Sequence, residues 1–168
     1  MGHEEHKDAA RAISQVACAV LIVTDTRTEA EDKSGGLAKS LLLSEGHRVS
    51  SYALIPNDPS RILQQLDSFL SGEGELLLVS GGTGLGSRDL TIETVAPRLE
   101  RELPGFGELF RYLSYKEIGS SAMLSRATAG TIGRKLIILL PGSHKAVELA
   151  LTRLILPELR HLFREITR

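Results

Sequence analysis

Glycine-rich backbone beside a carboxylate is the feature of this sequence best suited to chemistry. The stretch SGGTGLGSRDLTIET, residues 80–94, has four glycines in its first seven residues and Asp89 close behind them. Backbone without side chains can bring amide N–H groups against a phosphate, and the start of a following helix adds a favourable dipole. Asp89 has the wrong charge to hold phosphate directly, but Mg²⁺ binds carboxylate and phosphate oxygens together. The stretch therefore indicates a phosphate site with a magnesium ligand or, equally, a tight turn in which Asp89 caps the next helix.

Two familiar nucleotide-binding patterns are incomplete in this stretch. GGTGLG does not complete the dinucleotide fingerprint G-x-G-x-x-G, and no acidic residue stands at the distance expected for a ribose contact. No Gly-Lys-Ser/Thr follows, so the stretch is not a P-loop. A nucleotide-dependent dehydrogenase is therefore disfavoured, whereas a scaffold whose glycine loop only turns remains an alternative.

The composition is that of an ordinary soluble domain. The chain has 168 residues, 42% of them hydrophobic, and a net charge of −1, which favours one domain and no electrostatic attraction to nucleic acid or to anionic membranes. No apolar run approaches the roughly 20 residues needed to span a bilayer, and the charged N-terminus lacks a signal core. Cys18, the single cysteine, lies in the apolar run VACAVLIV and is expected to be a buried thiol. These features predict a cytoplasmic protein with a flexible segment over residues 1–14 and one domain over residues 15–168.

Strands and helices alternate along the chain. Buried strands are predicted at 16–23, 75–80 and 136–140 and a further strand at 47–55, with helices at 35–45, 59–70 and 91–100 and from His144 onward. A turn at Gly133-Arg134 predicts a hairpin, and segment 104–126 is expected to form short helices broken by glycines. This order of elements predicts an α/β protein of three layers, α/β/α, with a mainly parallel sheet and one edge hairpin.

Particular side chains are expected to begin or end the helices. The predicted N-caps are Ser34, Thr91 and Asp58, the last followed by Pro59 at the first helical position, and Gly46 is a predicted left-handed stop. Pro157 should begin or kink the final helical segment.

Three loops should meet at one edge of the sheet. Right-handed crossovers bring the loops that follow parallel strands to the same side, where ligands of open α/β sheets bind. Here these loops are 24–34, 80–89 and the turn at Pro141.

Several separate motifs together resemble the MoaB/MogA family of molybdenum cofactor biosynthesis. They are TDTRTEAEDKSGG, VSGGTGLGSRDLTIE, PGFGELFRYLSYKEIGSSAMLSRATAG and LPGSHKAVELAL, which occur in the family's order from about Val16 to His161. The segment LSYKEIGSSAMLSRA is more similar to the MoaB branch than to MogA.

The resemblance implies a fold, an activity and an assembly. Members have a compact α/β fold and form trimers or, in the MoaB branch, hexamers. The active branch uses ATP and Mg²⁺ to transfer AMP to the terminal phosphate of molybdopterin, releasing pyrophosphate. The expected ligands are therefore molybdopterin, a nucleotide and magnesium, without a protein nucleophile.

The resemblance also carries over to individual positions. The family's phosphate-contacting loop is matched by Gly81, Gly82, Thr83 and Gly84, and the catalytic, metal-associated acid of its R-D-x-T motif by Asp89. The LSR motif near the pterin site is matched by Ser125 and Arg126, and a turn with backbone donors by Pro141, Gly142 and Ser143. The family's first loop is matched by Thr24, Asp25 and Ser34. The structural alternatives are an ion pair for Arg126, helix capping by Ser143 and purely structural loop ends for the first loop.

Two departures from the family pattern bear on activity. His144 stands where proline usually follows P-G-S/N, which leaves that turn looser. Asn57 stands where active relatives commonly carry aspartate, and the neighbouring Asp58 is the candidate second catalytic carboxylate as well as a helix cap. A MoaB-like oligomer that binds molybdopterin without adenylylating it is therefore the alternative function.

Apolar side chains near the C-terminus suggest where subunits could meet. Leu149, Leu151, Leu154 and Ile155 give the last helix more hydrophobic surface than an edge helix needs, which predicts an oligomer interface there. Met123 and Leu124 are expected to be core residues or subunit contacts.

Overall fold

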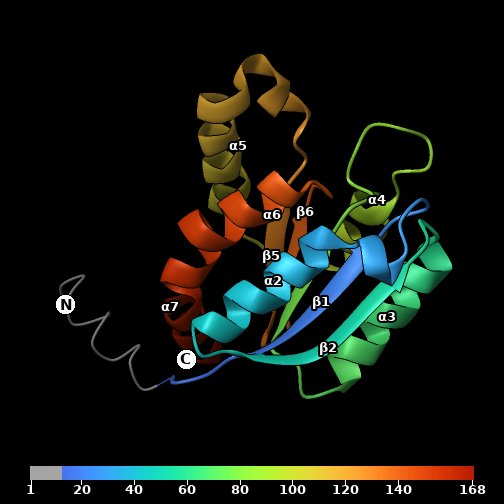
Figure 1. Ribbon diagram of the computed structural model, residues 1–168. Helices are drawn as coiled ribbons and strands as arrows, with labels where there is room; N and C mark the ends of the chain where they lie inside the picture. Colours follow the sequence, from blue (N-terminus) through green and yellow to red (C-terminus); the bar gives the residue numbers. More distant parts are fainter. Residues whose placement is uncertain (1–12) are drawn as a thin grey trace.

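A six-stranded sheet runs through the centre of the protein (Figure 1). The computed structural model describes residues 13–168, so most of the predicted flexible segment 1–14 lies outside the described residues. The strands are β1 (Ala17–Val23), β2 (Arg48–Ile55), β3 (Leu76–Ser80), β4 (Arg101–Glu102), β5 (Thr128–Ile132) and β6 (Lys135–Leu140), in the spatial order β2-β1-β3-β6-β5-β4. Strands β2, β1, β3 and β6 are parallel, and β5 and β4 are antiparallel additions. The predicted mainly parallel sheet with an edge hairpin is confirmed, extended by the short strand β4.

Helices cover both faces of this sheet. One face carries α2 (Lys33–Ser44), α5 (Pro104–Ile118), α6 (His144–Ala150) and α7 (Leu156–Thr167), and the other carries α3 (Pro59–Ser71) and α4 (Thr91–Val95). Alternate residues of β1 serve the two cores: Cys18 belongs to the first cluster and Ala19 to the second. All seven residues of β1 are buried, as a parallel strand between two helical layers requires. The predicted three-layer α/β/α fold is confirmed.

The predicted helix caps are partly right. Asp58 caps α3, because its Oδ1 accepts from Arg61 N at 2.8 Å, and Gly46 has the expected positive φ of 81°. Ser34 is not the cap of α2; Asp32 is, with Oδ1 accepting from Gly35 N at 2.9 Å. The hydroxyl of Tyr52 on β2 donates to the other oxygen of Asp32 at 2.7 Å, so a contact across 20 residues fixes the cap.

The helix after the glycine-rich stretch is shorter than predicted. Helix α4 ends at Val95, and a 3₁₀ turn, η2 (Ala96–Arg98), follows it. The N-cap position belongs to Leu90, which makes no side-chain capping bond, so the prediction that Thr91 caps this helix is wrong. Thr91 is the first helical residue, and its buried hydroxyl is used elsewhere.

Segment 104–126 is not a set of short helices broken by glycines. Residues 104–118 form the single helix α5, which Pro104 begins at the first helical position, where a missing N–H is harmless. Gly107 lies inside it because a Cβ there would come within 2.7 Å of the Ala127 carbonyl oxygen. The helix ends at Gly119, with a φ of 65°, and a 3₁₀ helix, η3 (Gly119–Leu124), follows.

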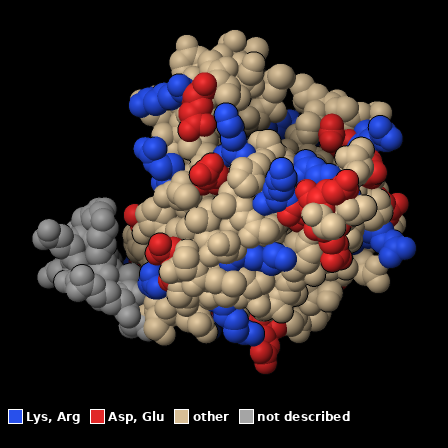
Figure 2. Space-filling view, viewed as in Figure 1, with Lys and Arg blue, Asp and Glu red and all other residues tan. Residues whose placement is uncertain are grey.

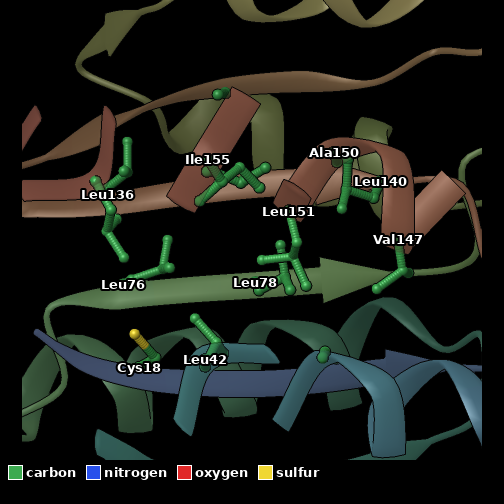
Figure 3. Close-up of a cluster of buried hydrophobic side chains, with 14 of the residues drawn as sticks. Cys18, Leu42, Leu76, Leu78, Leu136, Leu140, Val147, Ala150, Leu151 and Ile155 are labelled. Atoms are coloured by element: carbon green, nitrogen blue, oxygen red, sulfur yellow. The ribbon is translucent and has the colours of Figure 1, made fainter. Parts of the chain in front are cut away.

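The C-terminal residues expected to form an oligomer interface lie in the protein's own core. Leu149, Leu151 and Ile155 are buried, and Figure 3 shows Leu151 beside Leu78 of β3, with Ile155 in the same cluster. A π-helical stretch, η4 (Leu151–Ile155), joins α6 to α7, and Pro157 follows in the first turn of α7, as predicted. The premise that these side chains form excess exposed surface is therefore wrong for Leu149, Leu151 and Ile155.

Large apolar side chains are exposed instead on a part of the molecule that projects beyond the sheet (Figure 1). They belong to α5 and η3: Leu109, Tyr112, Tyr115, Ile118, Met123 and Leu124, each more than half exposed. Met123 is 77% exposed and is not a core residue. Within residues 13–168, no helix is both long enough and apolar enough to cross a membrane.

Candidate functional site

A cleft of about 700 Å³ lies where the parallel strands end. The chain passes from β1 to β2 on one side and from β3 to strands on the other side, so the strand order reverses between β1 and β3, which is where open α/β sheets bind ligands. The predicted site residues that line it are Thr24, Asp25, Gly81, Gly82, Thr83, Gly84, Asp89, Ser125, Pro141 and Gly142. The volume is in the range of small-molecule sites. Residues from four separated loops therefore meet in one cleft.

Four predicted site residues do not line the cleft and make other contacts. Ser143 Oγ accepts from Ala146 N at 3.1 Å and caps α6, while the carboxylate of Asp58 caps α3. Ser34 Oγ donates to the Gly142 carbonyl at 3.2 Å, and so links the first loop to the turn after β6. Arg126 donates to the carbonyls of Thr83 and Gly84 in the glycine loop.

The glycine loop needs glycine at its first two positions for conformation and for space. Gly81 and Gly82 have φ values of 106° and 65°, a region that other residues rarely adopt. A Cβ on Gly81 would overlap the Val23 carbonyl oxygen, and one on Gly82 would overlap the side chains of Asn57 and Thr91. The backbone of the glycine loop therefore packs directly against the end of β1.

Backbone carbonyls and amides of this loop are used differently. The carbonyl oxygens of residues 81–84 all accept hydrogen bonds, from Thr91 Oγ1, Thr91 N, Arg126 Nε and Arg126 Nη2 in turn. The N–H groups of residues 82–85 donate to no partner within residues 13–168. Four consecutive amide donors are thus left available beside the cleft.

Asp89 closes the glycine loop and does not cap α4. Its Oδ2 accepts from Gly86 N at 3.0 Å, and its own N–H donates to the Gly86 carbonyl at 3.0 Å. The capping alternative for Asp89 is therefore wrong. Oδ1 accepts no hydrogen bond from the described part of the chain, which leaves one carboxylate oxygen available in the cleft.

Asp25 and Asn57 also line the cleft. Asn57 N donates to Asp25 Oδ1 at 2.8 Å, which ties the loop after β1 to the loop after β2. The Asn57 Oδ1 atom is buried beside Gly82 and has no partner among the described residues. A buried oxygen without a donor is unfavourable, so this position suits a ligand or ion that satisfies it.

These oxygens fit a magnesium ion that is shared with a substrate. No cluster of three or more His, Cys, Asp or Glu side chains with metal-binding geometry occurs in residues 13–168. Mg²⁺ commonly takes one or two carboxylates together with substrate phosphates and water. Asp25 and Asp89 are two such carboxylates on one cleft.

Two arginines in the cleft were not predicted as site residues. Arg27 and Arg88 both line it, and Arg27 Nη2 also donates to the Gly142 carbonyl at 3.1 Å. Each lies one or two residues from a predicted site aspartate, and that proximity in loops after strands was the signal available in the sequence. Figure 2 shows basic and acidic side chains interspersed over one face of the protein.

The described residues around the cleft offer no activated cysteine. Cys18 is fully buried in β1, and burial raises the pKa of its thiol to about 12. A smaller hollow of about 360 Å³ between α3 and the edge strand β2 contains none of the predicted site residues. The chemistry of the cleft is therefore that of carboxylates, guanidinium groups and backbone amides.

Known proteins of one family are similar to this chain over nearly its whole length. A family model described as a probable molybdopterin binding domain matches residues 19–161. Molybdenum cofactor biosynthesis protein B of Staphylococcus carnosus is 49% identical over 91% of this chain and 92% of that protein. The protein of the same name from Bacillus cereus is 49% identical over 100% and 99%.

Solved structures give the same result. A crystal structure of molybdenum cofactor biosynthesis protein B has a TM-score of 0.88 and 50% identity, covering 92% of this chain and 97% of that one. The tungsten cofactor synthesizing protein MoaB from Pyrococcus furiosus has a TM-score of 0.83 and 33% identity, covering 92% and 98%.

The same substitution at two glycines should have opposite effects on stability. Gly81→Ala should lower the free energy of unfolding by about 1–3 kcal/mol, because its φ of 106° and the Val23 carbonyl both oppose a side chain. Gly36→Ala in α2 should raise it by about 0.5–1 kcal/mol, because a Cβ there meets nothing within 4 Å. Urea unfolding measures both, and a Gly81→Ala variant as stable as the wild type would contradict the loop conformation.

Proposed function

This chain belongs to the family of probable molybdopterin-binding domains that molybdenum cofactor biosynthesis protein B represents, and on that premise we propose that it adenylylates molybdopterin. The proposed substrates are ATP and the terminal phosphate of molybdopterin, and the products are adenylyl-molybdopterin and pyrophosphate. The observation that carries the proposal is one cleft with four unpaired loop amides on one side and the Asp89 carboxylate beside them.

The proposed reaction is a displacement at the α-phosphorus of ATP. An oxygen of the molybdopterin phosphate forms a bond to that phosphorus, and the bond from the phosphorus to the oxygen bridging to the β-phosphate breaks. Pyrophosphate leaves with the electron pair, and no proton is transferred in the bond exchange. The protein needs to align two anions and to stabilise the charge that grows on the leaving group.

The cleft residues are suited to these two tasks. The N–H groups of residues 82–85 are available to phosphate oxygens, and amides with few protein partners in a loop are a common anion site. Arg27 and Arg88 add positive charge on the cleft wall. No side-chain nucleophile is required, which agrees with the buried and protonated Cys18.

Asp89 and Asp25 are the residues that would hold magnesium. When bound, Mg²⁺ neutralises phosphate charge and orients the nucleotide. Asp89 retains the free oxygen Oδ1 for this role while Oδ2 keeps the loop closed. Asn57 Oδ1 is a third oxygen on the same cleft without a protein donor among residues 13–168.

Replacing Asp89 should reduce turnover much more than binding. Asp89→Asn keeps an oxygen that can accept from Gly86 N but removes the charge, so the rate of adenylyl-molybdopterin formation should fall about a hundredfold or more. Molybdopterin binding should change little, because the loop stays closed. The assay follows label from α-³²P-ATP into molybdopterin in the presence of Mg²⁺.

Asp67→Asn is the matched control for this experiment. Asp67 pairs with Arg98 on the outside of α3, away from the cleft, and its substitution should leave turnover unchanged. A wild-type protein that forms no product under conditions in which an active relative does would reject the proposed activity. Unaltered turnover in Asp89→Asn would remove Asp89 from the reaction.

A second function, binding of molybdopterin without adenylylation, is favoured by Asn57. An amide lies in the cleft where active relatives commonly carry a carboxylate, and the adjacent carboxylate of Asp58 is used in capping α3. Under this function the wild type binds molybdopterin but forms no product, and Asn57→Asp creates activity. Asp58→Asn, which preserves an N-cap, tests whether the neighbouring carboxylate contributes. Product formation by the wild type excludes the binding-only function.

We also propose that the protein is a homotrimer or homohexamer in which a second copy covers the exposed apolar side chains of α5 and η3. Monomers rarely expose contiguous apolar surface on this scale. The outer end of this part of the molecule is mostly uncharged in Figure 2. This face therefore replaces the C-terminal helix as the expected subunit contact.

Two leucines with similar exposure provide a matched test of this interface. Leu109→Glu on α5, where the side chain is 53% exposed, should shift the mass measured by light scattering toward the monomer. Leu43→Glu on α2, where it is 57% exposed, should leave the mass unchanged. A wild type that is monomeric at micromolar concentration would rule the assembly out.

A further inference from the structure

We infer that Arg126, oriented by Glu93, is a positioning residue that turns the glycine loop so that its amide N–H groups face the cleft. The inference rests on the proposed function, because it assigns how the anion site is prepared. Arg126, Glu93 and Thr91 are together called the carbonyl clamp. None of the three lines the cleft.

The guanidinium of Arg126 donates hydrogen bonds to three groups of the protein, namely two backbone carbonyls and one carboxylate. Nε donates to the Thr83 carbonyl at 2.8 Å, and Nη2 donates to the Gly84 carbonyl at 2.7 Å. Nη1 and Nη2 also reach the two Glu93 carboxylate oxygens, at 2.6 and 3.2 Å. These contacts join residues more than 30 positions apart and use the planar fork that only arginine offers.

Holding a carbonyl fixes the direction of the next amide. Every described peptide bond is trans, and in a trans peptide the C=O and the following N–H point in opposite directions. Because Arg126 holds the carbonyls of Thr83 and Gly84, the N–H groups of Gly84 and Leu85 point away from it. Gly84 lines the cleft and Arg126 does not, so the Gly84 amide is directed toward the cleft and the Leu85 amide follows it.

Thr91 does the same for the first half of the loop. Its hydroxyl donates to the Gly81 carbonyl at 2.8 Å, and its backbone N–H donates to the Gly82 carbonyl at 2.9 Å. The N–H groups of Gly82 and Thr83 therefore point away from Thr91. The clamp accounts for all four carbonyls, and four consecutive free amides are the result.

An ordinary surface ion pair would not explain this arrangement. The pair of Arg126 with Glu93 is partly exposed, with side chains 27% and 49% accessible, and such pairs contribute little to stability. The carbonyls that Arg126 holds belong to a glycine-rich loop, and glycine loses more conformational freedom on folding than any other residue. The contact of Arg126 with these carbonyls acts by ordering the loop before a ligand binds. The loop then loses less conformational entropy when the ligand binds.

The test compares binding of inorganic pyrophosphate to the wild type and to clamp variants by isothermal titration calorimetry. Arg126→Gln should weaken binding by about tenfold to a hundredfold, the scale for outer-shell partners of metal sites. Arg126→Lys keeps the charge but cannot hold both carbonyls, so it should restore only part of the affinity. Glu93→Gln should show a smaller loss, because Arg126 keeps its contacts to the loop.

The control is Arg98→Gln, which breaks an exposed arginine–aspartate pair outside the cleft and should leave pyrophosphate binding unchanged. Thermal unfolding checks that each variant is folded. Full recovery of affinity in Arg126→Lys would overturn the inference, because charge alone would then explain the effect. Unchanged affinity in Arg126→Gln would overturn it as well.

A measurement without ligand separates this inference from the proposed function. The ¹⁵N heteronuclear NOE of the Gly84 and Leu85 amides should have ordered-backbone values in the wild type and fall in Arg126→Gln. If the wild type binds neither pyrophosphate nor ATP, the proposed function fails, and the relaxation data still decide the clamp. Equal order of these amides in both proteins would show that Arg126 does not position the loop.

Discussion

The close approach of Gly81 to the Val23 carbonyl is the constraint on which the cleft depends. Strands β1 and β3 are parallel neighbours, so their carboxyl ends lie side by side, and the backbone after β3 must turn over the end of β1. Only glycine permits the turn, because a side chain would overlap that carbonyl. Gly142, in the turn after the next strand β6, packs on the Cα of Gly81. The ends of three strands are thereby brought together, and the cleft forms where they meet.

Polar side chains around the cleft act mainly on backbone carbonyls. Ser34 and Arg27 both donate to the Gly142 carbonyl, and Thr91 and Arg126 take up the carbonyls of the glycine loop. Each such contact occupies a carbonyl oxygen and so leaves amide N–H donors to face the ligand. The site therefore favours anions although the cleft itself carries no large net charge. Residues that resemble ligand contacts in the sequence can therefore serve the site indirectly, by fixing which side of the backbone faces the substrate.

Local patterns in the sequence predicted the fold well, and contacts between distant segments account for what they missed. The strands β1, β3 and β6, the hairpin at Gly133 and the Asp58 cap depend on a few adjacent residues, and all are confirmed. The true cap of α2 depends on Tyr52 from strand β2, and the bonds of Arg126 to the glycine loop join residues more than 40 positions apart. The sequence predicted that the glycine loop, Asp89 and the turn at Pro141 would meet, but not the role of Arg126.

The balance of groups in the cleft bears on how a metal would take part. The cleft has only two carboxylates, which are too few anionic ligands for a tightly held resident ion. Its two guanidinium groups and its row of amides suit an anion that brings its own cation. The unpaired Asn57 oxygen strengthens this interpretation, since a neutral oxygen can complete the shell of an ion already paired with phosphate. A carboxylate at that position would hold the ion before the nucleotide arrives. Under the proposed function, the amide at position 57 would therefore leave magnesium to arrive with the substrate.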